Sequence, residues 1–272
     1  MAIAIEKSPH ELRVLAIHAH PDDVEFQCAG TLAILRRLGC HVTIATMTAG
    51  DGGSAELSAS EISAVRRREA RASADLLGAD YVCLELCDLR IDVSEDSRRR
   101  VTEAVRKARP DLVLTAPPAD YLSDHEMTSR LVRDAAFNAS VRNFDTRDPA
   151  PAPLLGAVPH LYYVDTLEGV DIFGHPVLPD FYVDVSATFE TKKAMLACHE
   201  SQRRWLSAQH GIDEYLESME RWSRHRGREI GVEHAEAFRQ HRGHAYPRRN
   251  LLLALTAGAR ERPAIPAARA TA

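Results

Sequence analysis

The sequence predicts an α/β fold, a Rossmann-like three-layer sandwich with a mostly parallel sheet and helices on both faces. Short apolar runs alternate with longer segments of helical periodicity along the first half of the chain. This repeated strand–helix order is typical of parallel sheets with right-handed crossover connections. Gly39 and Gly78 stand where two of the helices should end, which is a common C-terminal helix signal.

Four strand–helix units are expected in the first half of the chain. Each strand is a short, mainly apolar run, and each helix has the spacing of an amphipathic segment. The strands are expected at residues 12–17, 41–47, 81–86 and 111–115, and the helices at residues 29–39, 61–77, 94–108 and 124–140. The Gly- and Ser-rich segment 48–60 is too polar for the core and should be a loop.

The regular order breaks at the Pro- and Asp-rich connection of residues 143–157. Beyond it, strands are expected at residues 160–164 and 181–185, and helices at residues 186–199 and 212–224. We predict one α/β domain over residues 1–256. Residues 1–142 form its Rossmann-like core, and residues 143–256 supply the strands that complete the sheet and the C-terminal helices. The Ala-, Pro- and Arg-rich tail, residues 257–272, is expected to be flexible.

The composition is that of a globular protein and argues against several classes of function. Hydrophobic residues make up 45% and charged residues 27% of the 272 residues, which is ordinary for a soluble globular protein. A formal net charge of -5 argues against a nucleic-acid partner. The apolar runs fall well short of the roughly 20 residues of a membrane span, and the first residues lack the basic-then-apolar pattern of a signal peptide. The sequence therefore predicts a cytoplasmic protein without a membrane span.

The turn after the first strand carries the strongest chemical signal. The apolar residues 14–17 lead directly into His20-Pro21-Asp22-Asp23. In open α/β sheets, ligands bind at the carboxyl ends of the strands. An imidazole and two carboxylates on one turn offer metal ligands and a spare carboxylate, which indicates metal-assisted hydrolysis. Helix capping is the alternative, but it accounts for one Asp and not for both together with the His.

A second polar group, Asp124-His125, follows the fourth strand at the start of a helix. It also lies at the carboxyl end of a strand, so we expect His125 to converge with His20 and Asp23 above the sheet. Two His and one Asp with an open position are the ligands of a catalytic zinc site rather than a structural one. Asp124 is expected either to cap the helix or to orient His125.

These residues resemble a family signature. The segment His20-Pro21-Asp22-Asp23-Val24-Glu25, with the following Ala29-Gly30, is similar to that of the PIG-L/LmbE-like family of zinc-dependent N-acetylglucosaminyl de-N-acetylases. The resemblance covers roughly residues 12–240. It continues through further short segments, namely Thr48-Ala49-Gly50-Asp51, Arg66 with Glu69, Asp124-His125, His199-Glu200-Ser201-Gln202, Arg226-Gly227 and Ala235-Glu236-Ala237-Phe238.

The resemblance implies a ligand set and a reaction. One Zn²⁺ per chain would be bound by His20, Asp23 and His125, with Fe²⁺ as an alternative because affinity order does not decide metal occupancy in cells. Asp22 would be the general base that deprotonates a water molecule. The reaction would be hydrolysis of the acetamide of an N-acetylglucosamine-containing substrate, which releases acetate and a free amine.

The chain departs from many family members at Leu122, where they carry a His three residues before the third ligand. His199 is an alternative group for stabilising the oxyanion, or else an ordinary polar residue near a helix end. By the same resemblance Arg66, Asp51 and Asp88 are candidates for contacts to sugar hydroxyls. Arg66 could instead belong to a solvated basic run, and Asp88 could be a turn residue.

Two other functions stay open on the sequence alone. One is an amidase that acts on a glucosaminyl thiol conjugate. The other is a non-catalytic module that binds a sugar or nucleotide, although the chain lacks the glycine-rich phosphate-binding motifs. Tyr121 and Trp222 are candidates for stacking on a sugar ring. The expected partners are a small amino-sugar substrate and, by family analogy, further copies of the chain in a trimer or hexamer.

Overall fold

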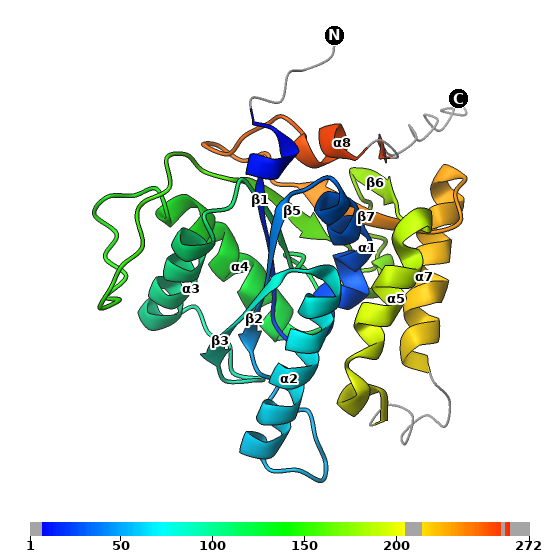
Figure 1. Cartoon of the computed structure of the whole chain (residues 1–272), viewed down its shortest axis with the longest axis horizontal. Helices are drawn as coiled ribbons and strands as arrows, with labels where there is room; N and C mark the ends of the chain where they lie inside the picture. Colours follow the sequence, from blue (N-terminus) through cyan, green and yellow to red (C-terminus); the bar gives the residue numbers. More distant parts are fainter. Residues whose placement is uncertain (1–6, 205–213, 257–258, 262–272) are drawn as a thin grey trace, which may run out of the picture.

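The computed structural model describes residues 7–204, 214–256 and 259–261. It has three layers, with a central sheet between two layers of helices (Figure 1). The α/β fold predicted from the sequence is therefore confirmed. No helix in the described ranges is both long enough and apolar enough to span a membrane.

The sheet in the described part of the chain has eight strands in the order β3-β2-β1-β4-β5-β7-β6-β8. The strands from β3 to β5 in this order are parallel, while β7 runs antiparallel to both of its neighbours and β8 runs antiparallel to β6. Their bounds are Arg13–His18 (β1), His41–Thr48 (β2), Asp80–Leu86 (β3), Leu112–Thr115 (β4), His160–Val164 (β5), Phe181–Asp184 (β6), Ala235–Gln240 (β7) and Arg260–Glu261 (β8).

Helices cover both faces of the sheet, so the parallel strands are buried on both sides. Helices α1, α2, α5 and α8 share one core with alternate strand residues, and α3 and α4 share the other. In β1, for example, Val14 and Ala16 belong to the first core, and Leu15 and Ile17 belong to the second. The bounds are Asp23–Arg37 (α1), Ala59–Leu77 (α2), Glu95–Ala108 (α3), Ser123–Asn138 (α4), Phe189–Ala197 (α5), Glu214–Ile230 (α7) and Leu251–Leu255 (α8).

The strand order reverses at β1, which has β2 on one side and β4 on the other. In open α/β sheets, the crevice outside the carboxyl ends of the strands at such a switch point is the usual ligand site. The segment 18–23 leaves β1 at this crevice, and the segment 116–125 leaves β4 there. The sheet topology therefore brings the two polar turns of the sequence to one place.

The first helix differs from its prediction. α1 begins at Asp23, six residues before the helix expected at residues 29–39, so the polar turn enters the helix without a break. The carboxylate of Glu25 is buried in this first part, where Ser73 donates a hydrogen bond of 2.7 Å to it. A buried Glu disturbs the amphipathic pattern, because the sequence pattern treats charged residues as exposed.

In the second half of the chain, the helices and the tail differ more from their predictions. The helix expected at residues 186–199 is a short 3-10 turn, Ser186–Thr188, followed by α5, so His199 lies beyond α5. The start of the helix expected at residues 212–224 lies outside the described residues, and α7 continues to Ile230. Most of the tail predicted to be flexible also lies outside them, but Arg260 and Glu261 form β8.

Strand β7 was missed because it carries a buried carboxylate. Glu236 pairs with the buried Lys192 at 2.6 Å and accepts hydrogen bonds from the backbone N–H groups of Gly30 (2.9 Å) and Thr31 (2.7 Å) in α1. Gly30 has no room for a side chain, since a Cβ there would lie 2.7 Å from the Cβ of Val185. The strand therefore ties the C-terminal half of the chain to the helix that begins at the polar turn.

Candidate metal centre and active site

The turn between β1 and α1 holds Asp22 in a conformation that few residues other than glycine adopt. Its φ is 103° and its ψ is -28°, and such strained backbone costs on the order of 1–3 kcal/mol. Asp22 stands at the N-cap position of α1, yet its side chain accepts no capping hydrogen bond. Helix capping therefore does not explain why this residue is an aspartate.

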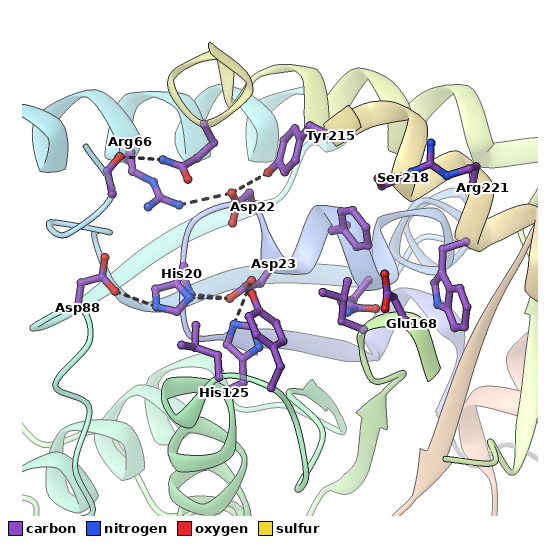
Figure 2. Close-up of a pocket in the computed structure, with 18 of the residues that line it drawn as sticks. His20, Asp22, Asp23, Arg66, Asp88, His125, Glu168, Tyr215, Ser218 and Arg221 are labelled. Atoms are coloured by element: carbon purple, nitrogen blue, oxygen red, sulfur yellow. Dashed lines mark hydrogen bonds and ion pairs between the residues drawn. The ribbon is translucent and has the colours of Figure 1, made fainter. Parts of the chain in front are cut away.

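The carboxylate of Asp22 instead faces side chains from two distant helices. Its Oδ2 accepts a hydrogen bond of 2.6 Å from the hydroxyl of Tyr215 in α7, and Nη2 of Arg66 in α2 lies 3.4 Å away (Figure 2). Arg66 also donates to the carbonyl oxygen of Pro21 at 2.7 Å. Burial raises the pKa of Asp22, and this effect outweighs the opposing charge of Arg66. A raised carboxylate pKa suits a general base that works near neutral pH.

Asp23, the first residue of α1, lies among three imidazoles. Its Oδ2 is 2.7 Å from Nδ1 of His18 and 3.2 Å from Nδ1 of His20. Its Oδ1 is 3.4 Å from Nε2 of His125. Burial by itself would raise the pKa of Asp23, but the neighbouring His18 and His125 hold it well below its ordinary value. Asp23 is therefore a buried carboxylate that stays ionised.

Further carboxylates contact the second ring nitrogen of two of these imidazoles. Asp120 Oδ1 lies 3.1 Å from Nδ1 of His125, and Asp88 Oδ1 lies 2.9 Å from Nε2 of His20. In each ring the other nitrogen faces Asp23. A carboxylate behind an imidazole is the usual support of a metal-binding His. Asp124 does not orient His125, because its Oδ2 accepts the N–H of Leu89 at 2.7 Å.

The donor set fits a divalent metal. Candidate ligand atoms of His18, Asp23 and His125 all lie within 4.8 Å of one another, and those of His20, Asp88 and Asp124 form a second such group. Nε2 of His125 is buried and has no hydrogen-bond partner among the described residues. Imidazole nitrogens with a carboxylate oxygen suit zinc and other first-row metals. The structure thus brings His20 and His125 to Asp23, while His18 rather than His20 shares the closest group with Asp23 and His125.

A cavity of about 890 Å³ opens above these residues, near the upper end of the roughly 300–1,000 Å³ of ligand pockets. His20, Asp22, Asp23 and His125 line the cavity (Figure 2), whereas His18 is buried and is not part of the lining. The sequence reasoning missed His18, although its place two residues before His20 at the end of a strand was a usable signal.

The candidates for sugar contacts occupy different places. Arg66 and Asp88 line the cavity, and Arg66 is only 4% exposed, so it does not belong to a solvated run. Asp51 is absent from the cavity lining and accepts the backbone N–H of Asp88 at 2.8 Å, which makes it a support of the loop. Tyr121 and Trp222 both line the cavity, and Tyr121 is 66% exposed at its edge.

His199 is fully buried and does not line the cavity. Its Nε2 lies 3.3 Å from Oε1 of Glu25. Burial has the largest single effect and lowers the pKa of His199, but the charge and hydrogen bond of Glu25 together with the charge of Asp22 outweigh it, and the net shift is upward. This position differs from the expectation that His199 touches a developing oxyanion. The neighbouring Ser201 donates through its backbone and hydroxyl to Glu69, so this motif joins its segment to α2.

Tyr215 and Asp120 were missed by the sequence reasoning. Tyr215 lies 193 residues from the carboxylate that it contacts, and an aromatic residue on a helix is ordinarily read as core. Asp120 stands five residues before His125, where an acidic residue close to a candidate ligand was a usable signal for an orienting carboxylate.

The fold and the site define a class. This is an α/β protein with a candidate metal centre and an adjacent carboxylate at the carboxyl ends of its parallel strands, which is the arrangement of a metal-assisted hydrolase. A sequence model of the PIG-L family (GlcNAc-PI de-N-acetylase) matches residues 15–136.

Similar proteins agree with this family. Diacetylchitobiose deacetylase of Thermococcus kodakarensis is 29% identical over 196 residues, which is 70% of either chain. The crystal structure of N,N'-diacetylchitobiose deacetylase from Pyrococcus horikoshii is 26% identical, with a TM-score of 0.73 over 90% of this chain and 91% of that one. The 4-oxalmesaconate hydratase of Pseudomonas putida is 22% identical over 69% of this chain and 73% of its own. Residues 15–136 thus match the PIG-L family, and the similar proteins include deacetylases, in agreement with the resemblance seen in the sequence.

Proposed function

We propose that this protein is a metal-dependent N-deacetylase that hydrolyses the acetamide of an N-acetylglucosamine-containing substrate and releases acetate and a free amine. The observation that carries the proposal is the placement of Asp22. Its backbone is strained, its side chain caps no helix, and its carboxylate lines the cavity beside the His and Asp cluster. The similarity to diacetylchitobiose deacetylases supports the choice of an acetylated amino sugar.

The proposed metal ligands are His20, Asp23 and His125, because these three line the cavity and His18 does not. The proposed ion is Zn²⁺, with Fe²⁺ as the alternative for the same donor set. When bound, such an ion would lower the pKa of a water molecule and polarise the acetamide carbonyl.

The residues around the cavity would then move the protons. Both hydrogen bonds that the carboxylate of Asp22 accepts in the described part of the chain fall on Oδ2, which leaves Oδ1 to accept a proton from water. Tyr215 and Arg66 fix the orientation of the carboxylate during this step. Asp22 would then pass the proton to the nitrogen of the leaving amine, since one positioned acid–base group can act in both directions. We propose His199 as a positioning residue through Glu25.

Activation of water also serves related reactions. An amidase that acts on a glucosaminyl thiol conjugate would cleave the same kind of bond at the same centre. A hydratase would add the water to a carbon–carbon double bond, as the name of the Pseudomonas putida relative indicates for that enzyme. The deacetylase relative is more similar, at 29% against 22% identity over alignments of the same length, and we therefore place deacetylation first.

A substrate panel tests the proposal. Purified protein is assayed for acetate release from free N-acetylglucosamine, its oligomers and its conjugates, with hydration of 4-oxalmesaconate measured in parallel. We expect acetate release from at least one amino-sugar compound, loss of that activity with a chelator, and recovery with added Zn²⁺ or Fe²⁺. Hydration without acetate release would contradict deacetylation. Turnover that a chelator leaves unchanged would contradict the metal.

Tyr215→Phe is expected to lower kcat on the best substrate by roughly 10- to 100-fold, because a hydrogen bond to a charged group contributes about 1.5–3 kcal/mol. The substitution removes only the hydroxyl that donates to Asp22, so KM and the melting temperature should change little. Tyr246→Phe is a matched control, because its hydroxyl donates to the carbonyl of Arg133 outside the cavity. Wild-type kcat in Tyr215→Phe would exclude Tyr215 from the site.

Two further expectations stay predictions of the sequence, namely the cytoplasmic location and the trimeric or hexameric assembly. Light scattering on the purified protein measures the second of these. A single species of about 30 kDa, the mass of one chain, would contradict it.

A further inference from the structure

Helix α7 supplies six of the residues that line the cavity. Its cavity-facing residues recur every three or four positions, which places them on one side of the helix. They are Tyr215, Ser218, Arg221, Trp222, His225 and Arg228. Tyr215 touches Asp22, while Arg228 stands thirteen positions further along, or about 20 Å at the rise of an α-helix. A cavity of this length takes a substrate much longer than one sugar ring.

The two ends of the cavity differ in charge. Asp22, Asp23 and Asp88 outnumber the one arginine, Arg66, at the end where α7 begins, and Arg221 and Glu168 lie on the other side of the view in Figure 2. Arg228 lines the cavity farther along α7. The end of the cavity formed by the later turns of α7 therefore carries two guanidinium groups and one carboxylate, with an imidazole between the guanidinium groups in sequence.

These cationic groups are only partly neutralised by the protein. Arg221 donates to Ser218 Oγ at 2.8 Å, and its nearest carboxylate, on Glu217, is 3.8 Å away. The guanidinium of Arg228 has no hydrogen bond or ion pair within the described ranges, and only its backbone oxygen accepts an N–H, that of Gly231, beyond the helix. Arginine side chains without a close carboxylate bind carboxylate and phosphate groups well, because the guanidinium fork offers two parallel N–H donors.

The wall beside them is rigid. Trp222 donates through Nε1 to Asp165 at 3.1 Å, and the guanidinium of Arg226 lies 4.6 Å from the centre of its ring. The imidazole of His225 stacks on the same indole at 4.9 Å. Fixed side chains lose little conformational freedom on binding, which favours recognition at this place.

We propose that the Arg221, His225 and Arg228 end of the cavity is a subsite for an anionic group, a carboxylate or a phosphate, carried by the substrate at the end remote from its acetamide. This inference rests on the proposed function, and it adds a substrate class to it. The amino sugar lies with its acetamide at Asp22, and its anionic substituent extends along α7 to the two arginines.

Matched glycosides test the subsite. In the test compounds, N-acetylglucosamine carries an alkyl chain long enough to reach from Asp22 to the two arginines, and the chain ends in a carboxylate, a phosphate or a neutral amide. Binding is measured by calorimetry, and kcat/KM is measured by acetate release. We expect the wild type to prefer the anionic glycosides by about tenfold or more, and the double variant Arg221→Gln/Arg228→Gln to lose that preference. The carboxylate and phosphate arms show which anion the subsite takes.

The control is Arg224→Gln, which removes a positive charge from the same helix. Arg224 pairs with Glu220 at 3.0 Å and does not line the cavity, so the preference should be unchanged. Equal binding of the anionic and neutral glycosides by the wild type overturns the subsite. An equal loss of affinity for all glycosides in the double variant also overturns the subsite, because the two arginines would then only stabilise the helix. A binding preference without any acetate release overturns the proposed function and supports the subsite.

Discussion

Asp22→Asn is expected to lower kcat by roughly 100- to 10,000-fold, the range that general base catalysis contributes. The amide cannot accept the proton from water, but it has the size of the carboxylate and can still accept the hydrogen bond of Tyr215. Asn also tolerates positive φ better than most residues, so the strained turn should persist. Steady-state kinetics on the best substrate of the panel measures this effect.

The metal content of this variant distinguishes loss of the general base from loss of the metal site. Asp22→Asn should retain the same amount of bound metal as the wild type, because Asp22 is not among the proposed ligands. Asp96→Asn, on the exposed surface of α3, controls for the loss of one negative charge and should keep wild-type kcat. A kcat near that of the wild type in Asp22→Asn would remove this residue from the role of base.

His125→Ala is expected to lose the bound metal, with an affinity reduced by more than the roughly 10- to 100-fold that loss of an orienting carboxylate costs. The ring supplies the buried Nε2 that faces Asp23, and alanine offers no ligand atom in its place. Elemental analysis of purified protein measures the metal, and a calorimetric titration of the chelated protein gives the affinity.

Three companion variants sharpen this test. Asp120→Asn keeps the imidazole and weakens only its orientation, so its affinity should fall by about 10- to 100-fold. His18→Ala shows whether this buried imidazole, which contacts Asp23, is also a ligand. His175→Ala, on an exposed turn, should bind metal like the wild type. A fully loaded His125→Ala protein would show that another residue is the third ligand.

The parallel core was predictable because the signals for its strands and turns lie in short, continuous stretches of sequence. A strand buried on both faces is a continuous apolar run, and the turn that follows it carries its polar residues next to one another. For this reason the elements from β1 to α4 and the pairing of the His20 turn with the His125 turn follow from the sequence. The exact start of α1 did not, because the partners that allow Glu25 to be buried lie far along the chain.

The parts that escaped prediction depend on contacts over long separations. Glu236 breaks the pattern of β7 because its partners come from α1 and α5. Tyr215 reaches Asp22 only after the chain has built the whole sheet. The burial of His199 follows from its pairing with Glu25 and not from its own neighbours in sequence. Each case is a polar group whose environment is set by tertiary structure.

The contacts of Glu236 have a consequence for modular engineering. This side chain on β7 accepts hydrogen bonds from two backbone N–H groups of α1 and also pairs with Lys192. The residues after the Rossmann-like core therefore cannot be exchanged independently of that core. A chimera that takes its C-terminal half from a relative must bring a matching acceptor and cation with it. Otherwise, the graft leaves a lone buried charge next to the helix that starts at Asp23.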